Sequence, residues 1–197
     1  MLASQSGQKI KPVLFIVLLL PLVMLAYRFY SDGFGANPIE TINRYTGDWA
    51  LRILLSTLAF SPLIRITRWN NIIQYRRMFG LFAFFYVCVH LTSYIVLDQF
   101  FDFGEIIDDV FKRPFITAGF SAFILLIPLA VTSTNKMVER LQFRWIQLHR
   151  IVYFVAMLAV LHFWWMVKID TREPMIYATI LAILLGYRLF FYIRRKI

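Results

Sequence analysis

The chain has 197 residues, of which 60% are apolar, 18% aromatic and only 16% charged. Soluble domains are about 45–50% apolar and about 25% charged, so a single core surrounded by water would not hide this much apolar surface. A lipid bilayer would hide it, and six helices of ~20 residues each would use most of the chain. The composition therefore excludes a soluble enzyme and leaves no room for a second, soluble domain.

The net charge of +10 and the single cysteine, Cys88, exclude further classes of protein and cofactor site. One cysteine excludes an internal disulfide, a Cys-rich zinc site, a Cys-ligated iron–sulfur cluster and a C-x-x-C-H haem attachment motif. The basic residues gather at the ends of apolar segments, which is typical of membrane orientation. We therefore expect membrane lipid and no nucleic acid as a partner, and we expect any haem to be held without thioether bonds.

Six apolar runs follow one another along the chain, with short polar segments between them. They exceed the ~10 residues of a barrel strand and do not alternate in polarity, so they predict helices. The predicted spans are about 13–30, 49–64, 78–97, 115–132, 146–167 and 175–193. They predict an all-α membrane protein, a bundle of six transmembrane helices that forms one domain over residues 1–197 without an internal sequence repeat.

Lysine and arginine are unevenly distributed over the segments that flank the spans. Most of them lie at the two termini and in the second and fourth connections, which predicts that the N- and C-termini are cytoplasmic. On the opposite side, residues 98–109 carry five acidic residues and no basic one. This segment is either a solvated loop or an electrostatic guide for a partner protein.

All three histidines, His90, His149 and His162, lie in predicted spans. An ionisable side chain inside a membrane is costly and marks a functional site by default, and a neutral imidazole is a good iron ligand. The alternative is that each histidine is a hydrogen-bonded residue of helix packing. The residue types alone leave both interpretations open.

Depth along the predicted helices separates the three histidines. At 1.5 Å per residue, His90 lies about 20 Å and His162 about 24 Å into their spans from the cytoplasmic side, so these two can hold one haem between the third and fifth helices. His149 lies near the cytoplasmic surface, ~20 Å from His162. At its level the third span offers Arg76 in place of a histidine.

A second haem at His149 would therefore need a sixth ligand of another kind. An ideal helix turns His149 and His162 apart by about 220°, so this site would also need a distorted helix. Alternatively, His149 could form a hydrogen bond with a flavin or a quinone.

Arginines near the span ends are candidates for contacts with the anionic groups of a cofactor. Arg52 lies near the outer end of the second span, and Arg76, Arg77 and Arg150 lie on the inner side. Guanidinium groups can bind haem propionates or a flavin phosphate in a bidentate manner. The alternative is snorkelling for Arg52 and positive-inside anchoring for the other three.

The sequence lacks the motifs of several common nucleotide-binding and hydrolytic sites. It contains no G-x-G-x-x-G after a strand, no Walker A loop, no H-E-x-x-H and no G-x-S-x-G. A nicotinamide site is therefore not expected, and electrons would come from a membrane quinol or a separate reductase.

Several motifs in one register resemble the MsrQ (YedZ) family, the haem-binding membrane subunits of bacterial periplasmic methionine sulfoxide reductase systems. The resemblance covers residues from about 12 to 193. The motifs that carry it are residues 35–38, 76–81, 90–94, 112–115, 117–119, 132–134 and 145–150, followed by His162.

The resemblance implies a multi-pass protein of the bacterial inner membrane within the ferric-reductase-like transmembrane group, which includes the NADPH oxidases. It implies haem b and an association with FMN. Such a subunit passes electrons from the quinone pool, or from a cytoplasmic flavin reductase, to the periplasmic molybdopterin subunit MsrP. That partner reduces methionine sulfoxide in oxidised periplasmic proteins, so this chain is expected to transfer electrons without being the catalytic subunit.

By the same resemblance, His90, His149 and His162 match the family's histidines and are the candidate iron ligands. NADPH oxidases have a fourth histidine where this chain has Arg76. The number of haems, one or two, stays open, and no motif places the FMN site.

Two alternatives to this function remain at the level of the sequence. The first is a cytochrome b subunit of another respiratory enzyme or a stand-alone ferric reductase. The second, from a different class, is a transporter that uses membrane histidines for proton coupling.

Overall fold

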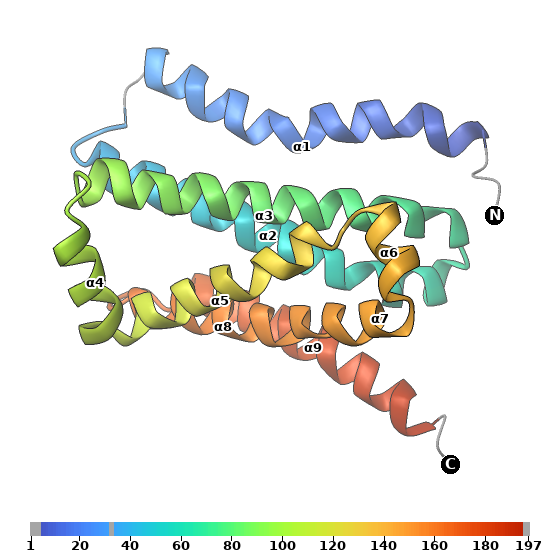
Figure 1. The fold of residues 1–197 in the computed structure, drawn as a ribbon. Helices are drawn as coiled ribbons and strands as arrows, with labels where there is room; N and C mark the ends of the chain where they lie inside the picture. The colour runs from blue at the N-terminus through green and yellow to red at the C-terminus, as the bar shows by residue number, and fades with distance from the viewer. Residues whose placement is uncertain (1–4, 32–33, 195–197) are drawn as a thin grey trace. The chain divides into compact units, whose positions relative to one another are not determined.

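The computed structural model describes residues 5–31 and 34–194, and the remaining residues of the predicted 1–197 domain lie outside the described residues. The described chain is built of helices (Figure 1). They are α1 (Gln5–Ser31), α2 (Pro38–Thr67), α3 (Arg76–Ser93), α4 (Phe103–Lys112), α5 (Pro114–Val131), α6 (Asn135–Leu141), α7 (Phe143–His149), α8 (Ile151–Met166) and α9 (Arg172–Arg194), with a 3-10 turn at Asn70–Tyr75 and a π-helical turn at Tyr94–Asp98.

Six helical segments of the described chain are long and apolar enough to cross a membrane. They are Ile10–Ser31, Pro38–Thr67, Asn70–Asp98, Pro114–Val131, Phe143–Met166 and Arg172–Arg194. The predicted all-α class with six spans is therefore confirmed.

The second helix begins well before the apolar run that predicted it. Asn37 accepts a hydrogen bond from the Glu40 N–H at 3.3 Å, and Pro38 occupies the first helical position. Both are strong helix-start features. The helix therefore includes the polar residues 38–48, which hydropathy alone assigned to a connection.

The chain folds as two compact units, Met1–Asp102 and Phe103–Ile197. In the first unit, α2 packs along α3. The buried side chains on α2 recur at every turn, at Thr46, Ala50, Leu54 and Leu58. Small residues among them allow a close approach of the two helices, which is how helices associate in lipid.

Helix α1 is attached to this pair by side-chain hydrogen bonds. The buried Tyr86 hydroxyl on α3 donates to the Leu18 carbonyl at 2.8 Å, and the Tyr45 hydroxyl on α2 donates to the Pro21 carbonyl at 2.9 Å. Most of the α1 surface is apolar and exposed, as expected for a helix that faces lipid.

In the second unit, α5 packs along α8, α9 packs on α8, and α4 packs on α5. The buried side chains of α5 again recur at every turn, at Ala118, Ala122 and Leu126. Val155 and Ala156 of α8 are fully buried. The two units thus use the same kind of packing between one pair of helices.

The fifth span is not one continuous helix, because α7 ends at His149 and α8 begins at Ile151. Around the break the Arg150 N–H donates to the Gln147 carbonyl at 3.2 Å, and the Tyr153 N–H donates to the Arg150 carbonyl at 3.1 Å. Hydrogen bonds between residues three apart in the chain are typical of a 3-10 turn, which winds more tightly than an α-helix. The helix is therefore distorted between His149 and His162, so these two side chains are not related by the rotation of about 220° that an ideal helix would give.

Candidate functional site

His90 lies in the last turn of α3 and is half-buried. Its Nδ1 is 2.9 Å from the carbonyl oxygen of Asn43 and 3.3 Å from the hydroxyl of Thr46, both on α2. The Asn43 side chain accepts a hydrogen bond from the Ser93 hydroxyl, one turn beyond the histidine on α3. These contacts attach the imidazole to the neighbouring helix rather than to its own.

His162 lies near the end of α8 and is also half-buried. Its Nδ1 is 2.6 Å from the carbonyl oxygen of Phe115 in the first turn of α5. The Phe115 ring lies 6.3 Å from the imidazole, centroid to centroid. This imidazole, too, is attached to the helix packed beside its own.

The two histidines share an arrangement that the sequence does not show as a repeat. In each pair the histidine stands 47 residues after the residue whose carbonyl it contacts. In each pair a glycine, Gly47 or Gly119, stands one helical turn after that carbonyl and faces the imidazole ring. We call the two arrangements the His90 pair and the His162 pair.

Both glycines leave the space that the imidazole rings occupy. A Cβ atom on Gly119 would lie 2.8 Å from Nδ1 of His162, and a Cβ atom on Gly47 would lie 3.1 Å from Cε1 of His90. The first distance is too short for any side chain without movement, and the second requires a small displacement. Only glycine therefore lets each histidine approach its partner helix this closely.

The hydrogen bonds also decide which ring nitrogen carries the proton. A carbonyl oxygen can only accept a hydrogen bond, so Nδ1 is the protonated nitrogen in both neutral rings. The lone pair then resides on Nε2. Metal-ligating histidines commonly donate their second N–H to a carbonyl, which orients the ring and raises its basicity. Each pair thus presents Nε2 in the form that a metal ligand requires.

His149 is held in a different way, at the last residue of α7. Its Nδ1 is 3.1 Å from the carbonyl oxygen of Trp145, one turn earlier on the same helix, and its ring stacks on the Trp145 indole at 3.8 Å. The indole N–H in turn donates to the Thr132 carbonyl at the end of α5, at 3.0 Å. His149 is therefore oriented through one aromatic neighbour, and its Nε2 is buried.

The predicted arginines occupy helix ends and surfaces. Arg52 on α2 pairs with Asp48 at 3.6 Å and lies 5.2 Å above the ring of Trp49, with its side chain 44% exposed. Arg76 and Arg77 are the first residues of α3, and Arg150 is the exposed residue between α7 and α8. The contacts of Arg52 fit the snorkelling alternative as well as a cofactor contact.

Sequence reasoning missed the residues that hold the histidines. Asn43 and Phe115 contact the imidazoles through their backbone carbonyls, and Gly47 and Gly119 make room through the absence of a side chain, so the residue types do not indicate these contacts. The equal 47-residue separation is the one signal that could have indicated them.

Arg188 of α9 is a further ionisable residue within a span that sequence reasoning passed over. It donates to the Tyr153 hydroxyl of α8 at 2.6 Å, and its guanidinium lies 4.9 Å above the Tyr153 ring. Arginine inside a membrane usually faces protein rather than lipid. These contacts join α9 to α8 just after the break at Arg150.

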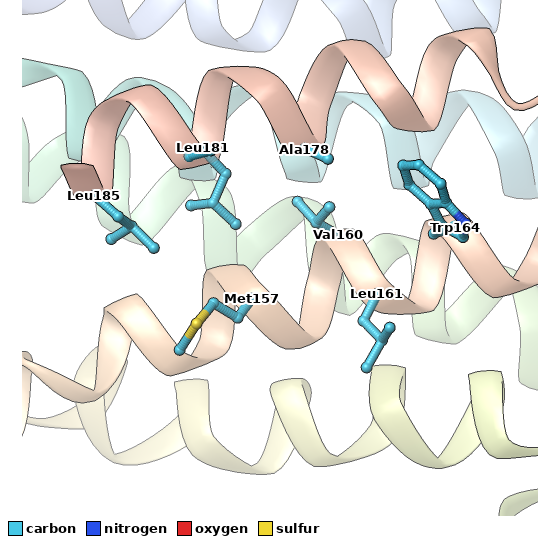
Figure 2. A pocket seen from close by; sticks show the side chains of 8 residues that line it. Met157, Val160, Leu161, Trp164, Ala178, Leu181 and Leu185 are labelled. Carbon is cyan, nitrogen blue, oxygen red and sulfur yellow. The ribbon is translucent and has the colours of Figure 1, made fainter.

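An apolar groove of about 320 Å³ lies between α8 and α9, and Figure 2 shows Met157, Leu161 and Trp164 on one side of it and Leu181 and Leu185 on the other. Every lining residue is apolar or aromatic. A site for a small-molecule substrate needs a few polar groups to orient it. The groove provides none beyond the Trp164 indole, so the histidine pairs remain the candidate site.

Comparison with known proteins agrees with this architecture. Residues 46–160 match the family described as ferric reductase like transmembrane component. No solved structure matches the chain. The six apolar helices of the described chain and this match together define the class: a membrane protein of the ferric reductase like type.

Curated relatives identify the particular family. The chain is 56% identical over 184 residues to the protein-methionine-sulfoxide reductase heme-binding subunit MsrQ of Herminiimonas arsenicoxydans, covering 92% of this chain and 84% of that protein. It is 54% identical to MsrQ of Rhodospirillum rubrum, covering 92% and 88%, and 48% identical to MsrQ of Xanthomonas campestris, covering 90% and 84%. The chain belongs to the MsrQ family.

Proposed function

We propose that this chain is the haem b subunit of a methionine sulfoxide reductase system and carries electrons across the bacterial inner membrane. The names of its relatives support haem binding and the reductase system. The observation that carries the proposal in this chain is the matched pair of histidines, each with Nδ1 on a carbonyl of the adjacent helix.

His90 and His162 are the residues that we propose would hold the haem iron, through Nε2. Two features of the structure fit this role: the protonated Nδ1 leaves Nε2 as the ligating atom, and the glycine opposite each ring leaves room that a Cβ would fill. When bound, the haem supplies a one-electron Fe(III)/Fe(II) couple. The protein's part is to orient both imidazoles and to surround them with apolar side chains, which help set the potential.

His149 is the proposed ligand of a second haem or a hydrogen-bonding partner of FMN or a quinone. The break at Arg150 supports a site here, since it provides the distortion that a site at this level requires. Arg76, Arg77 and Arg150 are proposed to hold propionate or phosphate groups on the cytoplasmic side, and Arg52 is proposed to do so on the outer side.

The electron path is proposed to begin at the quinone pool or a cytoplasmic flavin reductase and to end at the periplasmic molybdopterin subunit MsrP. The orientation of the chain in this proposal is supported by the uneven distribution of lysine and arginine, which predicts cytoplasmic termini. Both histidine pairs then lie towards the periplasmic side, since His90 is in the last turn of α3 and Phe115 in the first turn of α5.

The test is an optical difference spectrum, reduced minus oxidised, of the purified protein with iron and flavin quantification. Wild-type protein should show a low-spin b-type spectrum. His90→Ala and His162→Ala should each lose the absorbance band of the haem proposed to be held by these two residues, which we call the outer haem, because each variant removes one of the two imidazoles that would hold the iron. His149→Ala is the matched control within the same membrane segment, and it should keep that band.

Wild-type haem content in both His90→Ala and His162→Ala would contradict the ligand assignment. A colourless wild-type protein would contradict haem binding itself and favour the transporter alternative. Co-purification with a periplasmic molybdoenzyme separates the proposed role from that of a cytochrome b serving another enzyme.

A further inference from the structure

Helix α4 lies between two membrane-spanning segments, which end at Asp98 and begin at Pro114. Both of its ends are therefore on one side of the membrane. Within the second unit, α4 runs across the direction of α5 instead of continuing it (Figure 1). A helix that crosses the direction of the span that it precedes is oriented to lie along the membrane surface.

The surface of α4 is divided into three faces. Ile106, Asp109 and Val110 are buried or half-buried on the side that packs on α5. Next to it, three large apolar side chains stand one turn apart and are exposed: Phe103 by 63%, Ile107 by 58% and Phe111 by 83%. The opposite side carries polar residues.

That polar face carries acidic residues and one lysine. Glu105 and Asp108 are exposed, and Asp108 accepts a hydrogen bond from Lys112 one turn later. The hydrogen bond and the charge of Asp108 raise the pKa of Lys112, so its ammonium stays charged. The exposed part of α4 is thus amphipathic, with an apolar stripe on one side and charges on the other.

The orientation of α4 is set by contacts with the start of α5. The buried carboxylate of Asp109 pairs with Nε of Arg113 at 3.0 Å, and the Arg113 N–H donates to the Asp109 carbonyl at 3.0 Å. The Thr117 hydroxyl donates to the Val110 carbonyl. Because these bonds prevent rotation of α4 about its axis, the stripe cannot turn inward to bury its side chains.

We propose that α4 is an interfacial helix whose stripe of Phe103, Ile107 and Phe111 inserts into membrane lipid while Glu105 and Asp108 face water. Lipid is the occupant because α4 joins two membrane-spanning segments on one side of the membrane and crosses the direction of α5 (Figure 1), and because amphipathic helices lie in the plane of the interface. The polar face is mainly acidic and does not attract anionic headgroups, so burial of the apolar stripe is what holds α4 in the lipid. The proposal depends on the membrane location of the chain and not on haem binding.

Spin-label accessibility in phospholipid nanodiscs tests this proposal. Single cysteines at 103, 107 and 111, and at 105 and 108 as matched controls on the same helix, are introduced in a Cys88→Ala or Cys88→Ser background and labelled. Collisions with oxygen, which partitions into lipid, are compared with collisions with a water-soluble nickel chelate. The ratio of oxygen to nickel collisions should be several-fold higher at 103, 107 and 111 than at 105 and 108.

Equal ratios on the two faces, or nickel access to the stripe as high as at position 108, would overturn the proposal. Such a result would indicate a solvated helix or a surface for a protein partner. Circular dichroism and size-exclusion chromatography show that each labelled variant is folded. The three stripe positions are independent, so the loss of one variant leaves the test intact.

Discussion

The His90 pair and the His162 pair hold an imidazole in the same way, but they differ in how closely the ring fits against the glycine. In both, an imidazole near the end of one helix donates to a carbonyl of the neighbouring helix, opposite a glycine. In the His162 pair, a Cβ on the glycine would lie 2.8 Å from the ring, whereas in the His90 pair the shortest such distance is 3.1 Å. The His162 ring is therefore the more tightly fitted against its glycine.

The polar groups around the two imidazoles also differ. The Nδ1 of His90 lies near both a carbonyl and the Thr46 hydroxyl, and the Asn43 side chain accepts from Ser93. In the His162 pair, the residue before the glycine is Ala118, which has no hydroxyl. The His90 ring thus has a hydroxyl beside the carbonyl that it contacts, and the His162 ring has the closer glycine.

The largest expected effect comes from Gly119→Ala. The new Cβ would clash with His162 Nδ1, and the ring cannot move away without breaking its 2.6 Å hydrogen bond with Phe115. We expect the purified variant to lose most of the outer-haem absorbance.

Gly186→Ala is the matched control for that variant, because a Cβ there meets nothing within 4 Å. Alanine is favoured over glycine in a helix by up to ~1 kcal/mol, so the control should be at least as stable as wild type. Equal absorbance in Gly119→Ala and Gly186→Ala would show that the close fit has no role in ligation.

Gly47→Ala should have a smaller effect of the same kind. Its Cβ would lie 3.1 Å from Cε1 and 3.3 Å from Nδ1 of His90, which a displacement of a few tenths of an ångström relieves. We expect this variant to keep its haem and to show an altered low-spin electron paramagnetic resonance signal, because the imidazole is reoriented. Gly80→Ala, at a helical glycine with nothing within 4 Å of its Cβ position, is the control. A complete loss of haem in Gly47→Ala would contradict the prediction that the His90 pair tolerates a Cβ better than the His162 pair.

Trp145→Phe tests whether His149 belongs to a different site from the His90 pair and the His162 pair. Phenylalanine keeps a ring beneath His149 but removes the N–H that donates to Thr132, which costs about 1 kcal/mol. Thermal unfolding should report this loss. The spectrum of the outer haem should be unchanged, while any signal that depends on His149 should shift. A change in the outer-haem band alone would contradict the separation of the two sites.

The smallest effect is expected from Thr46→Ala, which gives the His90 pair the residue that the His162 pair has. The hydroxyl lies 3.3 Å from Nδ1, so its removal weakens the polarisation of the imidazole. A less basic ligand stabilises Fe(III) less, and the midpoint potential should rise slightly. Ala118→Thr tests the converse in the other pair. A fall in potential for Thr46→Ala would exclude this hydrogen bond as a tuning contact.

The predicted spans and the structure differ where polar residues belong to a helix. Residues 38–48 are helical because Asn37 and Pro38 start α2, although the apolar run begins later. The acidic segment after the third span contains α4, whereas one of the two alternatives at the level of the sequence was a solvated loop. Hydropathy measures transfer into lipid and not helix formation, so helices with polar faces were not recognised.

The sequence by itself determined the class of the protein and its six spans, and it predicted the three histidines as the centre of its chemistry. These follow from local composition, because lipid forces every backbone group into a helix and makes each buried ionisable residue costly. The tertiary structure alone decided which backbone carbonyl each histidine contacts, which glycine gives it room and where the fifth span is interrupted. Those features depend on the register between helices that are distant in the chain, and a glycine or a carbonyl carries no signal of that register until the helices are packed.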